Sequence, residues 1–125
     1  MDEGVKTLTT LMDFTTLRNK VLSSNIANSD TPGYTAKEVD FSAFFDKARL
    51  KMVSTSPMHY EIGTQPGHDG AVMNEDTLFW GDKNNVELDM EVAKMTENGL
   101  LYQGATKLIS TKYRLYKAAA KVTAQ

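Results

Sequence analysis

Residues 25–41 read NIANSDTPGYTAKEVDF, and this stretch joins two segments of different kinds. Its first part, residues 25–30, is rich in short polar side chains that compete for backbone hydrogen bonds and so tend to end a helix. Thr31 precedes a proline and is therefore pushed toward extended geometry. Pro32 and Gly33 fit the two central positions of a type II turn, in which the glycine takes the positive φ. The stretch predicts a helix end, a turn and an extended run.

Beyond the turn, Tyr34 is placed to pack back on the helix that the chain has just left. Val39 and Phe41 are two positions apart, so they lie on one face if the segment is extended. No nucleophile, acid pair or metal cluster is visible in the stretch. On its residues alone it is an ordinary helix end.

The segment before the turn, roughly Val5 to Asn28, is predicted to be an amphipathic helix. Apolar or small side chains recur there at steps of three and four residues, at Leu8, Leu11, Met12, Thr15, Leu22 and Ile26. Phe14, Leu17 and Val21 widen this face. A face so broad favours more than one packing neighbour.

The last segment, roughly Val86 to Val122, is predicted to be a long helix. One seven-residue series contains Leu88, Met95, Tyr102, Ile109 and Tyr116, and a second series beside it contains Leu101, Leu108, Leu115 and Val122. At about 1.5 Å per residue the helix is on the order of 50 Å long, more than a compact domain of this size accommodates. Its interior glycines, Gly99 and Gly104, reflect either sequence drift or the close approach of a neighbouring helix.

The middle of the chain has a different character. It holds all three prolines and one short helical candidate, Ser42 to Met52. From Ser54 to Asn85 turn signals are frequent, so this part is a loop, a small β excursion or a segment that orders only on binding. The chain thus divides into residues 1–30, 31–85 and 86–125.

Composition excludes several classes of protein. The 125 residues are 41% hydrophobic and 24% charged, and no apolar run is long enough to span a membrane. The absence of cysteine rules out disulfides and thiolate catalysis. A net charge of −2 argues against general nucleic-acid binding, although the end of the chain after Glu97 is basic. The acidic N-terminus lacks the pattern of a cleaved secretion signal, so export needs another route.

Candidates for catalysis or metal binding are weak. His59 and His68 match no metal-ligand spacing and are expected to be exposed to solvent. Glu87, Asp89 and Glu91 lie at the start of the last helix, where they fit the helix dipole better than acid–base chemistry. We therefore expect no enzyme activity, no cofactor, no metal and no small-molecule substrate. The role of Trp80, as a partner-surface anchor or a hydrophobic pin, stays open.

Two runs carry a family resemblance. Residues 23–41, SSNIANSDTPGYTAKEVDF, resemble the N-terminal motif of bacterial flagellar rod and hook proteins. Residues 84–110, NNVELDMEVAKMTENGLLYQGATKLIS, resemble the C-terminal helix of the proximal-rod subunit of that family. The corresponding motif turn consists of Asn25, Asn28, Asp30, Thr31, Pro32, Gly33 and Tyr34.

The resemblance implies a mainly α fold in which the two terminal helices pair as an antiparallel, coiled-coil-like α-domain with an irregular, short-β middle. We expect helix packing by Leu8, Met12, Leu22, Ile26, Leu101, Leu108 and Leu115. We expect an intersubunit contact at Tyr34, Val39 and Phe41.

The resemblance also implies a structural subunit that polymerises into the tubular rod of the flagellar basal body. Its partners are then copies of itself, other rod subunits, and proteins of the membrane (MS) ring and export gate. Its location is the periplasm, reached through the flagellar type III export channel without a cleaved signal. Nucleic acid is not an expected partner.

Two alternatives come from other classes of protein. A soluble helical adaptor or export chaperone could use the same helices to hold another protein, and it predicts a stable monomer or a small closed oligomer. An enzyme built on His59 and His68 predicts loss of function on His68→Ala.

Overall fold

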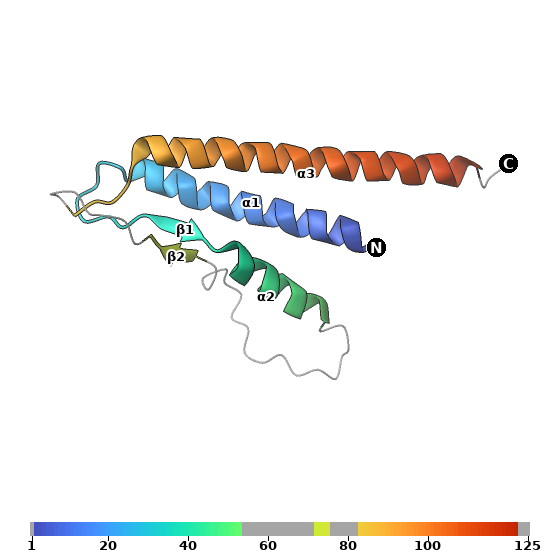
Figure 1. Cartoon of the computed structure of the whole chain (residues 1–125), viewed down its shortest axis with the longest axis horizontal. Coiled ribbons are helices and arrows are strands. Elements are labelled where there is room, and N and C mark those ends of the chain that lie inside the picture. The colour runs from blue at the N-terminus through green and yellow to red at the C-terminus, as the bar shows by residue number, and fades with distance from the viewer. Residues whose placement is uncertain (1, 54–71, 76–82, 123–125) are drawn as a thin grey trace.

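The computed structural model describes residues 2–53, 72–75 and 83–122. Its elements, in chain order, are α1 (Glu3–Ala27), β1 (Lys37–Val39), α2 (Phe41–Val53), β2 (Val72–Asn74) and α3 (Leu88–Val122) (Figure 1). The predicted fold class, mainly α with two long terminal helices and a short β element between them, is confirmed. His59, His68 and Trp80 lie outside the described residues, as does most of the segment between Ser54 and Asn85.

The two long helices lie side by side and run in opposite directions (Figure 1). Asn25 near the end of α1 contacts Glu91 near the start of α3, and Asp2 before α1 contacts Lys112 far along α3. Because α3 has 35 residues and α1 has 25, the last turns of α3 extend past the N-terminus of α1. This overhang lies beyond the part of α3 that α1 covers.

Side chains at the helix ends explain where the helices begin. The Asp2 carboxylate accepts a hydrogen bond from the Gly4 N–H at 3.3 Å, which caps α1. In α3, Asp89 and Glu91 occupy the first turn and Lys121 the last, so both ends have charges that complement the helix dipole.

The predicted turn is present. The Tyr34 N–H donates to the Thr31 carbonyl at 3.2 Å, which closes a four-residue turn with Pro32 and Gly33 at its centre. Gly33 has a φ of 74°, as the third position of a type II turn requires. The turn reverses the chain and brings β1 back along α1 (Figure 1).

Strands β1 and β2 form an antiparallel pair in which Glu38 lies opposite Met73. The short helix predicted at Ser42 to Met52 is confirmed as α2. The prediction that Phe41 is extended was wrong, because the Asp40 carboxylate accepts the Ala43 N–H at 2.8 Å and starts the helix at Phe41.

The hydrophobic core lies on the side of α1 that faces away from α3. It is formed by Phe14, Val39 and Phe44, from three different elements. The ring of Phe14 packs edge-on against Phe41 and Phe44, with centroids 5.2 and 5.6 Å apart. Helix α1 is therefore packed on two sides, by α3 and by the β1–α2 layer, as its broad apolar face predicted.

Candidate functional site: a polar junction of the two chain ends

The turn after α1 and the start of α3 meet in a set of buried polar contacts, which we call the junction. It contains Asn25 and Arg18 of α1, residues 34–38, Glu75, Asn84, Asn85, and Glu91, Lys94 and Glu97 of α3. Residues up to 79 positions apart in the sequence thus form one site.

Asn25 is fully buried at the centre of the junction. Its amide donates to the Lys37 carbonyl at 2.7 Å and to the Glu91 carboxylate at 2.8 Å. Its side-chain carbonyl accepts from the Lys37 N–H at 3.0 Å and from the Tyr34 hydroxyl at 3.2 Å. All the hydrogen-bonding capacity of this side chain is used, so Asn25 fixes the turn, β1 and α3 relative to α1.

Asn84 holds the end of α1. Its amide nitrogen lies 2.8–2.9 Å from three backbone carbonyls, those of Asn28, Ser29 and Thr31. These carbonyls belong to the helix end and the turn, where the last carbonyl groups of a helix have no N–H partner within the helix. The Asn84 side-chain oxygen accepts the Val86 N–H at 2.8 Å. One side chain therefore joins the end of α1 to the approach to α3.

Asn85 connects the residue before β1 and the residue after β2 to the approach to α3. Its side-chain oxygen accepts the Ala36 N–H at 2.6 Å, and its amide donates to the Glu75 carbonyl at 2.9 Å. The Glu75 N–H in turn donates to the Ala36 carbonyl at 2.8 Å. The Asn84–Asn85 pair thus clamps the motif turn on one side and the strand pair on the other.

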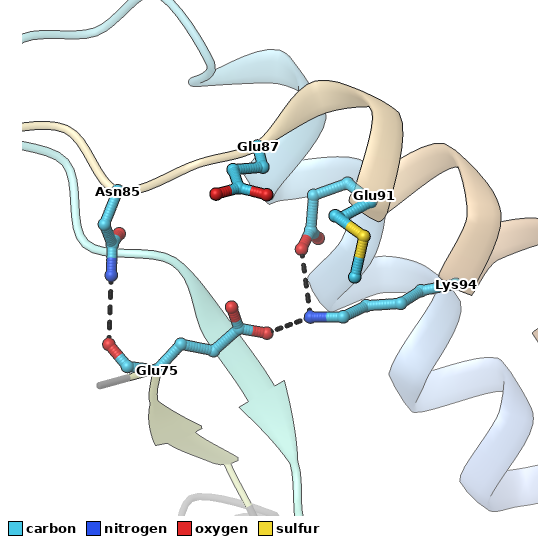
Figure 2. Close-up of a pocket in the computed structure, with 6 residues that line it drawn as sticks. Glu75, Asn85, Glu87, Glu91 and Lys94 are labelled. Atoms are coloured by element: carbon cyan, nitrogen blue, oxygen red, sulfur yellow. Dashed lines mark hydrogen bonds and ion pairs between the residues drawn. The ribbon is translucent and has the colours of Figure 1, made fainter. Parts of the chain in front are cut away.

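Two cations, Arg18 and Lys94, form ion pairs with the four carboxylates of the junction. The Lys94 ammonium contacts the carboxylate of Glu75 and lies 3.2 Å from that of Glu91 (Figure 2). It also lies 3.2 Å from the carboxylate of Glu38. The Arg18 guanidinium lies 2.9 Å from Glu38, and its far end lies 3.5 Å from Glu97. The cluster therefore links α1, β1, the end of β2 and α3.

The electrostatics of the cluster favour its charged form. Burial raises the pKa of Glu38, but hydrogen bonds from Arg18 and Lys94 outweigh burial and hold this pKa below its ordinary value. Burial lowers the pKa of Lys94, but hydrogen bonds to the three carboxylates raise it overall. Glu38 therefore contributes stability at neutral pH that is lost as the pH falls through its lowered pKa.

A small cavity of about 90 Å³ lies against Glu75, Asn85, Glu87, Met90, Glu91 and Lys94 (Figure 2). Its polar groups are mostly engaged with one another, and no nucleophile lies beside a base. In the described part of the chain, no group of side chains could hold a metal ion and no helix is long and apolar enough to cross a membrane.

Several junction residues escaped the sequence analysis. Glu91 was expected to serve helix-end electrostatics, but it is 1% exposed and bonded to Asn25 and Lys94. Asn84 and Asn85 carried a usable signal, because asparagines directly before a predicted helix are typical capping residues. The roles of Arg18 and Lys94 had no local signal.

The proposed packing residues divide between buried and exposed positions. Leu22 is fully buried in α1, and Leu8, Met12 and Ile26 are partly buried. On α3, Leu101, Leu108 and Leu115 are 40%, 57% and 64% exposed. The buried side chains of α3 are instead Glu91, Asn98 and Ala105, so α1 covers a neighbouring, more polar stripe of α3.

The proposed intersubunit residues also have different environments. Val39 is 4% exposed and belongs to the core of its own chain. Tyr34 is partly buried, and its hydroxyl contacts Ser24 and Asn25. Phe41 is 53% exposed, so of the three it offers most surface to another molecule.

Helix α3 carries an apolar groove beside its contact with α1. The groove has a volume of about 340 Å³ and is lined by Leu11, Glu97, Leu100, Leu101, Gly104, Ala105 and Leu108. A Cβ added at Gly104 or at Gly99 would meet no atom within 4 Å. No neighbour within the described part of the chain therefore requires glycine at either position.

Comparison with known proteins places the chain in a family. The family described as Flagella basal body rod protein matches residues 15–35, the second half of α1 and the motif turn. The flagellar basal body rod protein FlgB of Bacillus subtilis is 31% identical over 103 residues, covering 81% of this chain and 80% of that protein.

Two further relatives bear the same name. FlgB of Escherichia coli is 30% identical and covers 74% of this chain and 75% of its own length. FlgB of Aquifex aeolicus is 28% identical over 94% of this chain and 96% of its own length. The chain belongs to the FlgB family of flagellar basal body rod proteins.

Proposed function

We propose that the chain is a structural subunit of the proximal rod of the bacterial flagellum and that it polymerises through the uncovered faces of α3. The observation that carries this proposal is the exposure of α3. Among the described residues, ten large hydrophobic side chains of α3 are at least 40% exposed: Leu88, Met90, Val92, Leu100, Leu101, Tyr102, Leu108, Tyr113, Leu115 and Tyr116.

Eight of these side chains form two rows, because residues four, seven or eleven apart lie near one another on the surface of a helix. Met90, Leu101, Leu108 and Leu115 form a leucine row next to the groove. Leu88, Val92, Tyr102 and Tyr113 form a tyrosine row on the other flank. The side of α3 that faces away from α1 carries Gln103, Lys107, Ser110 and Arg114, all exposed.

A helix with a covered stripe, two apolar flanks and one polar side suits a wall in which each helix has two neighbours. The two flanks differ in composition, so their contact between copies is heterologous rather than two-fold symmetric. Heterologous contacts that do not close produce a helical filament or tube. The similarity to proteins named as flagellar rod proteins supports the same assembly.

In this proposal the junction gives each subunit a fixed shape, and α3 provides the contacts. The exposed Phe41 contributes to a further contact with an adjacent subunit. The subunit crosses the inner membrane through the flagellar export channel without signal cleavage and takes its place in the periplasm. There it joins the membrane ring and export-gate proteins to the next rod subunits. It acts without catalysis.

The test replaces exposed residues of the leucine row by acids. Leu108→Asp with Leu115→Asp should leave the circular dichroism of the free chain unchanged, because both side chains are more than half exposed. In cells that lack the wild-type gene, this variant should abolish rod assembly and motility.

The matched control is Gln103→Asp with Ser110→Asp, which places two acids seven residues apart on the polar side. This control should swim normally. Normal motility of the leucine variant would show that the leucine row of α3 is not part of the contact between subunits. The adaptor alternative would be favoured by two results together. The purified wild-type chain would form a stable small closed oligomer, and cells that lack the gene would still assemble rods.

A further inference from the structure

Residues 72–75 attach to the helical body by a small number of contacts. β2 pairs with β1, the Glu75 N–H donates to Ala36, and the Glu75 carbonyl accepts from Asn85. The Glu75 side chain adds its ion pair with Lys94. A strand of three residues gains little from its ladder alone, so the packing of Val72 on the core and the ion pair of Glu75 both help to hold it.

Lys94 contacts three carboxylates, and each comes from a different element. Glu38 belongs to β1. Glu75 follows β2, and Glu91 lies one turn before Lys94 on α3 (Figure 2). The three side chains are 28%, 15% and 2% exposed, so water screens their charges only in part. Without the ammonium, three like charges would lie around one point.

The three carboxylates differ in what else holds them. Glu38 also pairs with Arg18, and Glu91 also accepts a hydrogen bond from Asn25. The carboxylate of Glu75 has Lys94 as its ion-pair partner among the described residues. Loss of the Lys94–Glu75 pair therefore weakens the attachment of residues 72–75 more than that of β1 or α3.

We propose that Lys94 is a positioning residue that holds β2 against β1 without being required for the pairing of α1 with α3. Val72 packs on the core and β2 covers the free edge of β1. Release of β2 thus uncovers that edge and part of the core while the helix pair stays folded. Lys94, on α3, thus holds the two strands in place, and α3 is also the helix that carries the exposed apolar rows.

The test is amide hydrogen exchange on the full chain. Glu75→Gln removes the charge on the strand side and leaves Lys94 with Glu38 and Glu91, so the helix pair keeps its contacts. Exchange in residues 72–75 should become at least about tenfold faster, and exchange in the α1–α3 contact should change by less than about threefold. Lys94→Met should also accelerate exchange in residues 72–75, with an added effect around Glu38 and Glu91 because their carboxylates lose the ammonium as well. Lys94→Arg should keep exchange in residues 72–75 slow.

The matched control is Glu87→Gln. Glu87 lies against the same cavity and is exposed, and Figure 2 shows no contact from its carboxylate to Lys94. Exchange in this control should equal that of wild type. The proposal is overturned if Glu75→Gln leaves residues 72–75 protected, if it accelerates exchange equally along both helices, or if these residues are unprotected in wild type.

A second readout rests on the proposed function. If the chain is a rod subunit, Glu75→Gln should reduce the number of assembled rods while Glu87→Gln should not. The two hypotheses fail separately. If Glu75→Gln gives fast exchange at residues 72–75 but normal rods, Lys94 has the positioning role and that role is not needed for assembly. If rods form in cells that lack the gene, the proposed function is refuted and the positioning role of Lys94 is not affected.

Discussion

At the scale of single residues, Asn25 does more for the architecture than any apolar side chain near it. It sits at the point where a helix, a turn, a strand and a second helix meet, and it bonds to backbone and side chain at once. An apolar residue could fill the same volume but would leave the Lys37 backbone groups without the partners that Asn25 provides and would take one hydrogen bond from the Glu91 carboxylate. Buried polar groups without partners are costly, so the site demands an amide.

Replacement of Asn25 by aspartate should show this demand. The change keeps the shape of the side chain but removes both N–H donors and places a second carboxylate against Glu91. The free energy of unfolding should fall by at least about 2 kcal/mol, because the Lys37 carbonyl and the Glu91 carboxylate each lose the hydrogen bond that the Asn25 amide donates. Urea denaturation at neutral pH measures this loss.

Asn19→Asp is the matched control, since Asn19 lies in the same helix and is exposed. Its stability should stay within about 0.5 kcal/mol of wild type. Equal stabilities of the Asn25 and Asn19 variants would contradict the central role of Asn25 in the junction.

At the scale of elements, the sequence was sufficient wherever structure depends on near neighbours. The periodicity of both long helices, the turn at Pro32 and Gly33, and the short helix after it are local signals, and all are present. The orientation of α3 was predicted less well. Two apolar series lie side by side on it, and the sequence cannot tell which stripe α1 will cover.

The junction could be predicted only in part. The helix end and the return of Tyr34 to α1 followed from local chemistry, and they are confirmed by the contacts of Tyr34 with Ser24 and Asn25. The burial of Glu91 was not predictable, because its stabilising partner Asn25 is 66 positions away. Charged residues near a helix start usually face water, and only the folded arrangement reverses that expectation.

The interior glycines of α3 give a prediction at this scale. A Cβ at Gly104 meets open space, so Gly104→Ala should stabilise the free chain by about 0.5–1 kcal/mol through helix propensity alone. Gly104→Phe should leave the free chain folded but fill the apolar groove and prevent rod assembly.

Gln103→Phe is the control for this prediction, because it adds the same ring to the adjacent, exposed position outside the groove. Thermal unfolding of the purified chains and counts of rods in complemented cells provide the two measurements. Normal rods with Gly104→Phe would show that no neighbour enters the groove.

At the scale of the whole molecule, the contacts that fix the fold and the exposed apolar surface lie in different places. The junction and the Phe14 core fix one end of the helix pair, while α3 continues past the N-terminus of α1 with apolar flanks uncovered. Near that end, Asp2 is bonded to Lys112 and Tyr116, both at 2.5 Å, which ties the start of α1 to α3. Under the proposed function, a subunit of this design gains its missing contacts in the polymer.

The most direct test of this account is electron cryo-tomography of basal bodies in host cells that lack the gene, with and without the wild-type copy restored. The account predicts basal bodies that retain the membrane ring and lack the rod, and it predicts recovery of the rod on complementation. Intact rods in the deletion strain would contradict it.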